Sequence, residues 1–256
     1  MLYNGIKIYK GDLRNNSLIE KTFNDIYKNH KVLDGVIHFG GLKSVAESIS
    51  KPISYWKTNV LGTINLLDIM SKYQSRNLVF SSSATIYGSS NNSFLKEDSE
   101  LKPINPYGNT KLTVETFLDD IFNSYKKEWH IASLRYFNPI GAHYSGLTGE
   151  SPKGIPNNIF PLIINTASGL QKELKVFGND WPTNDGTPIR DYIHVMDLAT
   201  THINVLEYLI SKKSKFLKIN VGTGKGTSVL ELIKTFEKVN NVKVPYVFAK
   251  RRPGDK

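Results

Sequence analysis

The sequence predicts an α/β fold built on a parallel, doubly wound sheet. Short apolar runs typical of buried strands occur at GVIHF (35–39), NLVFSSS (77–83) and WHIASLRYF (129–137). Apolar residues recur at helical spacing between these runs, at residues 45–73 and 106–125. Strands that alternate with helices in this way are typical of consecutive βαβ units, in which helices cover a parallel sheet.

The chain has 256 residues, of which 39% are hydrophobic and 22% charged. This length can bury one large core or two modest ones. Although the formal net charge is +10, the basic residues are mostly lysines scattered along the whole chain. We therefore expect solvated helix faces and no nucleic-acid partner, because phosphate backbones are bound by clustered Lys and Arg.

Composition also bears on location and on metal sites. No apolar run is long enough to span a bilayer, and MLYNGIKIYKGD lacks the apolar core of a secretory signal. The absence of cysteine excludes disulfides and thiolate metal sites. His38 and His194 flank apolar runs without a second ligand at metal spacing, so we expect structural roles for both and no metal. A cytoplasmic protein with no membrane contact is expected.

The second half of the chain changes character after Asn138. The stretch YSGLTGESPKGIPNNIF (144–160) is rich in Gly, Pro and Asn and is interpreted as a long loop before another helix. We expect a first region over residues 1–138 and a second over 139–256. Segments of the second region are expected to return to the main sheet.

Tyr107 and Lys111 indicate proton-transfer chemistry. They lie four residues apart on a predicted helix and so share one of its faces. A phenol with an ordinary pKa of about 10 acts as a base near neutral pH only if its phenolate is stabilised, and a neighbouring ammonium can do that. Ser83, at the end of a predicted strand, could bridge the phenol oxygen and a substrate oxygen. Because such a pair often occurs by chance, the other motifs of the chain must decide whether it is catalytic.

Several further motifs accompany the pair in order along the chain: HFGGLKSVAES from His38, NVLGTINLL from Asn59, SSSATIYG from Ser81, LRYFNPIGAH from Leu134, RDYIHVMDLA from Arg190, and a final RRPGD. Together with NPYGNTK, they resemble the nucleotide-sugar branch of the extended short-chain dehydrogenases, and within it the UDP-glucose 4-epimerases. The resemblance implies a Rossmann-like NAD-binding domain and a smaller α/β substrate-binding region. It also implies NAD as cofactor and a UDP-sugar as substrate.

The resemblance implies roles for individual residues. The catalytic residues would be Ser83, Tyr107 and Lys111. The cofactor would be bound by Asp12, Leu13, Phe39, Gly40, Gly41, Leu42, Lys43, Asn59, Ser83, Tyr107, Lys111 and Phe137. The substrate would be bound by Lys43, Ser83, Tyr107, Asn138, Asn158, Arg190, Arg252 and Asp255. Taken singly, Asn59 and Asn158 could instead be helix caps, Arg190 a surface ion pair, and the two phenylalanines core residues.

The implied reaction interconverts UDP-galactose and UDP-glucose, as in galactose metabolism. Tyr107 would take the proton of the sugar 4-hydroxyl as hydride passes to NAD, and the resulting 4-ketose would receive the hydride on its other face. Related 4,6-dehydratases and decarboxylases carry carboxylates beside this serine, whereas Ala84 follows Ser83 here. Epimerisation is therefore expected over those reactions. The resemblance also implies a homodimer formed through the helices that contain WKTNVLGTINLL and KLTVETFLDDIF.

One expected element is missing. A dinucleotide fold holds the cofactor pyrophosphate on a Gly-rich turn after its first strand, and no such turn precedes Gly11. IKIYKGDLRN resembles the third strand of the family and the turn after it, so the sheet is expected to lack its first βαβ unit and the following strand to be left at an edge. GTGKG, from Gly222, is expected to be a structural turn and not a phosphate loop. A catalytically silent fragment, or one part of a split enzyme, is the alternative function.

Overall fold

The computed structural model describes residues 6–29, 33–89, 94–125, 128–152, 154, 156, 158–211 and 214–251. The chain divides into two compact units that interleave along the sequence. Unit 1 comprises Met1–Ser89, Asp98–Leu134 and Asn204–Ile219, and unit 2 comprises Ser90–Glu97, Arg135–Ile203 and Asn220–Lys256. Segments from both halves of the sequence therefore contribute to each unit.

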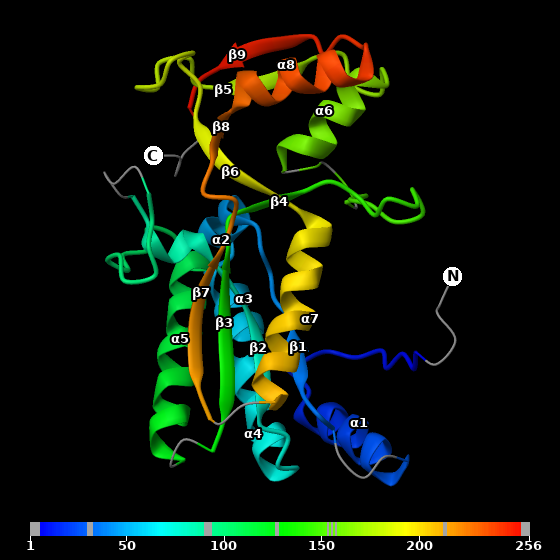
Figure 1. Ribbon diagram of the computed structural model, residues 1–256, viewed down its shortest axis with the longest axis vertical. Coiled ribbons are helices and arrows are strands. Elements are labelled where there is room, and N and C mark those ends of the chain that lie inside the picture. Colours follow the sequence, from blue (N-terminus) through cyan, green and yellow to red (C-terminus); the bar gives the residue numbers. More distant parts are fainter. Residues whose placement is uncertain are drawn as a thin grey trace. The chain divides into compact units, whose positions relative to one another are not determined.

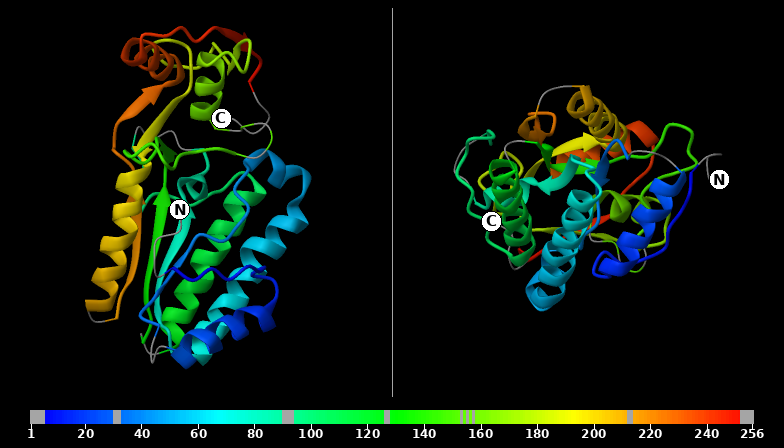
Figure 2. Two further views of the ribbon diagram at one scale, coloured as in Figure 1. Left: turned by 90° about the vertical axis from the view of Figure 1, so that its right-hand side faces the viewer. Right: turned by 90° about the horizontal axis from the view of Figure 1, so that it is seen from below.

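A sheet with the strand order β1-β2-β3-β7 forms the centre of unit 1. Its strands are β1 (Val36–His38), β2 (Asn77–Ser83), β3 (His130–Tyr136) and β7 (Phe216–Val221). The first two pair in parallel, with His38 opposite Phe80. Helices α1 (Asn16–Asn29), α4 (Gly62–Lys72) and α5 (Pro106–Ser124) cover one face, and the unit 1 part of α7 (Val195–Ser211) covers the other (Figures 1 and 2). The α/β prediction and its three strands are confirmed.

The core of unit 1 lies between this sheet and helices α1, α4 and α5. Leu78 and Phe80 alternate along the inner face of β2, as the two-residue period of a strand requires. They pack with Leu66 and Met70 of α4 and with Leu118 of α5 in one buried cluster. Burial of this apolar surface is the main force that holds the helices on the sheet.

The segment over residues 45–73 is helical, as predicted, but it is interrupted. It forms α2 (Val45–Ser50), α3 (Pro52–Tyr55), a π-helical stretch (Trp56–Leu61) and α4. Pro52 has no N–H to continue the hydrogen-bond ladder of α2, and it begins the next helix instead. A π-helical turn places one extra residue in the helix and often marks a functional position. Asn59 lies in this turn.

The N-terminal segment differs from the expected strand. No strand forms within described residues 6–12, and Ile6 and Ile8 are 58% and 64% exposed. Lys7 and Tyr9 instead contact the carboxylate of Asp25 on α1. A strand needs a neighbour to hydrogen-bond its backbone. Within the described residues this segment pairs with no strand, and β1, at the end of the sheet, pairs with β2 alone.

The described residues of unit 2 form two small sheets, the helices α6 (Ile159–Ala167) and α8 (Val229–Asn240), and the first part of α7. One sheet has the order β4-β6-β8, with β4 (Asn138–Ile140), β6 (Ile189–His194) and β8 (Gly226–Ser228); the other pairs β5 (Leu174–Phe177) with β9 (Tyr246–Ala249) in parallel. Helices α6 and α8 bury Ile163, Leu230 and Ile233 against Leu174 and Val176 of β5. Ser228 and Glu231 cap the start of α8 reciprocally.

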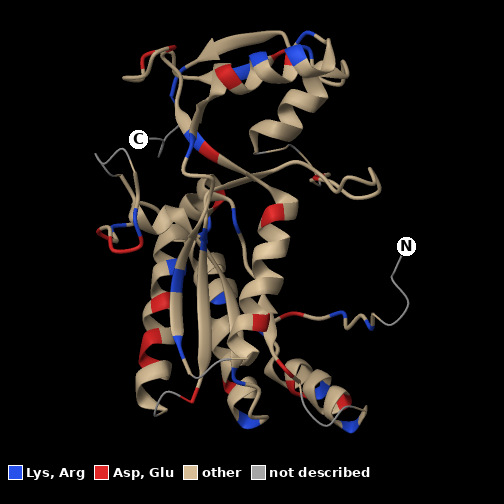
Figure 3. Cartoon of the chain, viewed as in Figure 1, with Lys and Arg blue, Asp and Glu red and all other residues tan. Residues whose placement is uncertain are grey.

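Charged side chains are distributed over both units. Figure 3 shows Lys and Arg interspersed with Asp and Glu along the helices and strands, and one such pair joins Lys218 of β7 to Asp119 of α5. No helix among the described residues is long and apolar enough to cross a membrane.

We expect Leu174→Ala to lower the free energy of unfolding by about 2–5 kcal/mol, because it leaves a cavity in the core of unit 2. Leu174 is 0% exposed. Urea unfolding followed by circular dichroism measures the change. The matched control is Leu170→Ala, the same substitution at a leucine that is 81% exposed, for which less than about 0.5 kcal/mol is expected. Equal effects of the two substitutions would contradict this core.

Candidate active site

The first turn of α5 positions the predicted catalytic pair. The side chain of Asn105 accepts a hydrogen bond from Gly108 N at 2.8 Å, and Pro106 occupies the first helical position. This local sequence fixes where the helix begins, so that Tyr107 lies in its first turn and Lys111 one turn later. The structure brings both residues to the end of β2, where Ser83 lies. The Ser83 side chain hydrogen-bonds Tyr107, and Lys111 Nζ donates to the carbonyl oxygen of Ser81 at 2.6 Å.

Ser83 is oriented by Thr85, a residue that the sequence analysis did not single out. Ser83 Oγ accepts hydrogen bonds from Thr85 N at 3.2 Å and from Thr85 Oγ1 at 2.9 Å, at the start of a 3₁₀ turn (Ala84–Tyr87). Because these two bonds occupy the acceptor sites of the oxygen, the hydroxyl proton of Ser83 is left to be donated to Tyr107. The Ser-x-Thr spacing at a strand end, typical of a turn capped by a hydroxyl, was the available signal.

Two effects within the protein shift the pKa of the Tyr107 phenol in opposite directions. Burial raises the pKa of Tyr107 above its usual value, and the hydrogen bond from Ser83 opposes this by lowering it. The ring of the fully buried Tyr55 packs edge-on against that of Tyr107, at 6.5 Å between centroids and 82°. Tyr55 is itself held by its hydroxyl, which donates to Ser44 O at 2.7 Å. The phenol thus has a fixed ring position and a directed hydrogen-bond donor.

Lys111 is a buried cation. Its side chain is 5% exposed, and Nζ lies 4.8 Å from the centre of the Phe80 ring and 5.9 Å from that of Tyr107. Burial disfavours the charged form and lowers the pKa of Lys111 to about 8, although the nearby Glu115 raises it in part. An ammonium group has three donors, and one of them is directed to Ser81 O. The group can therefore act as a positive charge and a multiple donor beside Tyr107.

Asn59 holds the loop that the resemblance assigns to the cofactor. Its Oδ1 accepts from Leu42 N at 2.7 Å, and its Nδ2 donates to Leu42 O at 3.0 Å and to Thr110 Oγ1 at 3.0 Å. Asn59 is 3% exposed and does not cap a helix; it ties the loop to α5. The close approach explains Gly41, where a Cβ would lie 3.1 Å from Asn59 Oδ1. In the same loop, Phe39 and Lys43 have exposed side chains.

His38 ends β1 beneath this loop, and its role is structural. Its Nε2 lies 2.9 Å from Thr63 Oγ1, and Thr63 Oγ1 donates to Asn59 O at 2.6 Å. The Thr63 hydroxyl therefore accepts from His38, which places the imidazole proton on Nε2. Burial, together with the charge of Lys111, lowers the pKa of His38 to about 4, so the ring is neutral near pH 7. Within the described residues, no group of three or more His, Cys, Asp and Glu could hold a metal ion.

Asp12 and Leu13 precede α1 in unit 1. The Arg14 side chain hydrogen-bonds Asp12 and holds the pKa of that carboxyl low, at about 2. Leu13 packs against the unit 1 core, and its carbonyl oxygen accepts from Asn65 Nδ2 at 3.1 Å. Leu13 also lies beneath Gly40, where a Cβ would come within 2.2 Å of its side chain. The two predicted cofactor segments of unit 1, around residues 12 and 40, are therefore in contact.

Of the predicted substrate residues outside the trio, Lys43 lies in the loop of unit 1, and Asn138, Asn158 and Arg190 lie in unit 2. Asn138 begins β4, and Arg190 lies in β6 with its guanidinium donating to Ile189 O at 2.8 Å. Asn158 stands at the start of α6, but its side chain makes no capping bond there and contacts Glu150 instead. Phe137 lies next to Gly222, where a Cβ would meet its ring at 2.8 Å. Arg252 and Asp255 fall outside the described residues.

The glycine-rich GTGKG segment forms a closed turn. Asp191 accepts hydrogen bonds from Thr223 N at 2.9 Å, Thr223 Oγ1 at 2.7 Å and Gly224 N at 2.8 Å. Gly224 adopts a φ of +70°, a conformation that favours glycine. The backbone N–H groups that a phosphate loop would present are thus bound to a carboxylate. This agrees with the expected structural turn.

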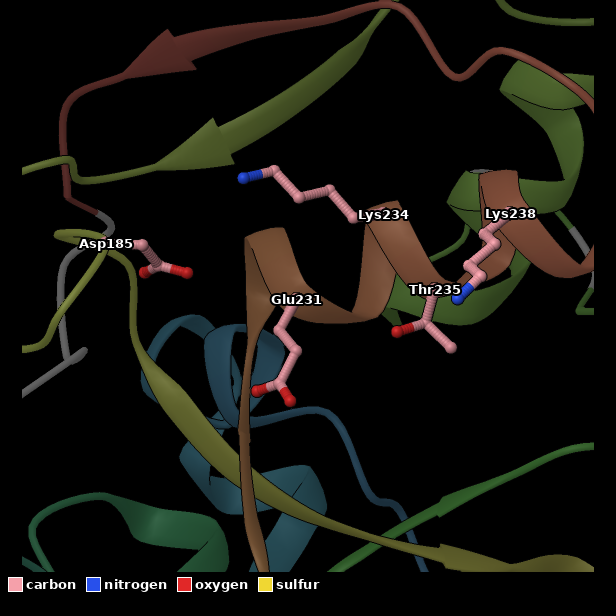
Figure 4. Close-up of a pocket in the computed structure, with 5 residues that line it drawn as sticks. All are labelled: Asp185, Glu231, Lys234, Thr235 and Lys238. Atoms are coloured by element: carbon pink, nitrogen blue, oxygen red, sulfur yellow. The ribbon is translucent and has the colours of Figure 1, made fainter.

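A separate surface hollow of about 310 Å³ lies along α8 (Figure 4). It is lined by Asp185, Glu231, Lys234, Thr235 and Lys238. None of these residues belongs to the predicted site, and the two lysines are offset by two carboxylates. We therefore place the candidate site at the end of β2 and not in this hollow.

Comparisons with known proteins identify the family. UDP-glucose 4-epimerase 2 of Arabidopsis thaliana is 48% identical over 252 residues, which cover 98% of this chain and 70% of that protein. The chain belongs to the UDP-glucose 4-epimerase family. The Bacillus subtilis (strain 168) UDP-glucose 4-epimerase is 47% identical, with 98% of this chain and 72% of the relative covered. Residues 2–256 also match the broader family described as GDP-mannose 4,6 dehydratase.

Solved structures agree with this family. The UDP-glucose 4-epimerase of Bifidobacterium longum, crystallised with NAD+ and UDP, superposes with a TM-score of 0.91 at 45% identity, covering 98% of this chain and 73% of that one. The chain spans 66% of the length of UDP-glucose 4-epimerase 4 from Oryza sativa subsp. japonica and 60% of a second epimerase from that plant.

The stability of this epimerase-family chain should depend on His38. Its pKa is lower in the folded chain, about 4, than in an unfolded one, about 6.5. The imidazole is neutral in both states above pH 6.5, so it costs no stability there. As the pH falls from 6.5 to 4 the unfolded state takes up the proton first, and about 3 kcal/mol of stability is lost.

Urea unfolding at several pH values tests this expectation. We expect His38→Gln to reduce the loss of stability between about pH 6.5 and 4, because glutamine cannot take up a proton. The matched control is His194→Gln, the same substitution at an exposed histidine, for which a smaller change in slope is expected. An unchanged slope in His38→Gln would show that the imidazole does not titrate differently in the two states.

Proposed function

We propose that this chain acts as a UDP-glucose 4-epimerase, interconverting UDP-galactose and UDP-glucose through a 4-keto intermediate with bound NAD. The observation that carries the proposal is the arrangement of Ser83, Tyr107 and Lys111 at the end of β2 in a chain 48% identical to a named epimerase. Both halves of the arrangement, the directed hydrogen bond and the buried ammonium, are what a tyrosine base requires.

In the proposed reaction, Tyr107 takes the proton from the sugar 4-hydroxyl. Ser83 donates its hydrogen bond to the tyrosine oxygen, which favours the phenolate, and Thr85 holds Ser83 in the orientation that does so. Bound NAD would supply a reversible hydride acceptor and, when oxidised, a second positive charge near the phenol. Return of the proton from Tyr107 accompanies reduction of the 4-ketose on its other face. Each residue ends the cycle in its starting state.

The chain offers suitable groups for the nicotinamide half of the cofactor. Lys111 has donors that can reach ribose hydroxyls, and the loop of residues 39–43 is fixed beside it by Asn59. Burial raises the pKa of Tyr107 more than the Ser83 hydrogen bond lowers it, so the further lowering required of a base falls to the combined positive charges of Lys111 and NAD. The cofactor roles of Asp12, Leu13, Phe39, Gly40, Gly41, Leu42, Lys43, Asn59 and Phe137 form part of the proposal.

The substrate residues of the proposal are Lys43, Asn138, Asn158, Arg190, Arg252 and Asp255. Arginine is suited to the pyrophosphate of a UDP-sugar because its guanidinium is always charged and donates in a fixed geometry. Dehydration, which the name of the matching broader family suggests, is the competing reaction. Ala84 carries no carboxylate at the position beside Ser83, so the motif favours epimerisation. A cytoplasmic location completes the proposal.

NAD content and turnover test the proposal together. We expect the purified chain to release about one NAD per chain on denaturation and to convert UDP-galactose to UDP-glucose. Tyr107→Phe should lower kcat about 10²–10⁴-fold while NAD remains bound, because only the proton-transfer group is lost. Tyr125→Phe is the matched control, since Tyr125 ends the same helix with an exposed side chain. A chain that binds no NAD and has no turnover would support the alternative of a silent fragment.

We also propose that two copies pair through the helical face of residues 45–72. Exposed apolar side chains gather on these consecutive helical segments: Ile49, Ile53, Trp56, Leu61 and Ile64. Such a face is costly to leave in water and is typical of a protein–protein interface.

Light scattering tests the pairing. We expect a mass about twice the 28.9 kDa of one chain, and Ile53→Lys should reduce it to one chain because it places a charge on the apolar face. Ile203→Lys on α7, where the isoleucine is also exposed, should leave the mass unchanged. A wild-type mass of one chain would contradict the dimer.

A further inference from the structure

Glu115 is a buried carboxylate that the proposed reaction does not use. It lies on α5 one turn after Lys111 and two turns after Tyr107, so the three residues share one face of the helix. Glu115 is 2% exposed, and its carboxylate accepts a hydrogen bond from Ser82 Oγ. A buried carboxylate costs free energy unless other groups stabilise it, so its presence calls for a reason.

The contacts of Glu115 and Lys111 reach neighbouring residues of one strand. Lys111 Nζ donates to the carbonyl oxygen of Ser81 at 2.6 Å, and Glu115 accepts from the side chain of Ser82. The next residue along β2 is Ser83, which hydrogen-bonds Tyr107. These bonds join α5 to three consecutive residues of β2. A displacement of Glu115 would therefore be transmitted to both Lys111 and Ser83.

The charges around Lys111 give Glu115 a specific electrostatic effect. Three titratable groups of the described residues face Lys111: Tyr107 and Glu115 on α5, and His38 on β1. Tyr107 is a neutral phenol in its resting form, and His38 is neutral near pH 7 because its pKa is about 4. Glu115 thus supplies the negative charge that opposes the desolvation of Lys111, whose pKa is about 8. Without that charge more of the lysine would be neutral at neutral pH.

We propose that Glu115 is a positioning residue, whose carboxylate holds the Lys111 ammonium seated against β2 and beside Tyr107. The inference rests on the proposed function only in that Lys111 is given a catalytic role. The interaction of Glu115 with Lys111 involves no ligand, so it can be measured without cofactor or substrate.

NMR of the full chain labelled with [ε-¹³C]lysine tests the proposal. The Lys111 resonance is identified by its absence from Lys111→Met, and its titration is followed from about pH 6 to 10. We expect Glu115→Gln, which keeps an acceptor for Ser82 but removes the charge, to lower the midpoint for Lys111 by about one unit. Glu115→Asp should restore part of the shift. Asp120→Asn, the matched loss of an exposed carboxylate from the same helix, should leave the midpoint unchanged.

A midpoint in Glu115→Gln equal to that of the wild type would overturn the proposal and leave Glu115 a purely structural partner of Ser82. A second measurement covers the case in which Glu115→Gln does not fold. In the wild-type chain, the Lys111 resonance must report a charged ammonium near pH 7, and an uncharged amine there would also overturn the proposal. Loss of epimerase activity or of NAD binding leaves both readouts intact, so failure of the proposed function is distinguished from failure of this inference.

Discussion

The buried ammonium of Lys111 is the constraint on which the candidate site depends. A charge removed from water must be compensated, and the chain does so with the Ser81 carbonyl, the faces of two aromatic rings and the nearby Glu115. Each partner comes from a different turn of α5 or from the end of β2. The cation is stable only if helix and strand keep this register, so the same contacts that stabilise Lys111 also place Tyr107 and Ser83.

Side chains from the neighbouring helical segments also hold the site in place. Asn59, in the π-helical turn, uses both ends of its amide to hold the backbone of Leu42 and reaches Thr110 on α5. Tyr55, one turn earlier, packs on the ring of Tyr107. Two residues outside the Ser83, Tyr107 and Lys111 trio thus fix the base and the adjacent loop. The irregular turn thus contains the residue that makes all three contacts.

The N-terminal segment shows that sequence pattern and family resemblance do not suffice to predict a strand. Ile6 and Ile8 alternate with polar residues as a strand would, and the family pattern supports that reading. Strand formation also requires hydrogen bonds to a neighbouring backbone, and within the described residues this segment pairs with no strand. In the described residues the segment contacts α1 through the side chains of Lys7 and Tyr9. Secondary structure that depends on a partner strand is not a local property.

The sequence by itself determined the α/β class, the strands at residues 77–83 and 129–137 and the helix that begins at residue 106, and it offered Ser83, Tyr107 and Lys111 as candidates. The elements follow from apolar periodicity, and the candidates from the i, i+4 spacing and the family resemblance. Only the tertiary structure decided the orienting bond from Thr85, the clamp of Asn59 on Leu42 and the burial that lowers the pKa of Lys111. Those features arise between residues far apart in the chain, and desolvation is set by everything packed around a group, which no local pattern encodes.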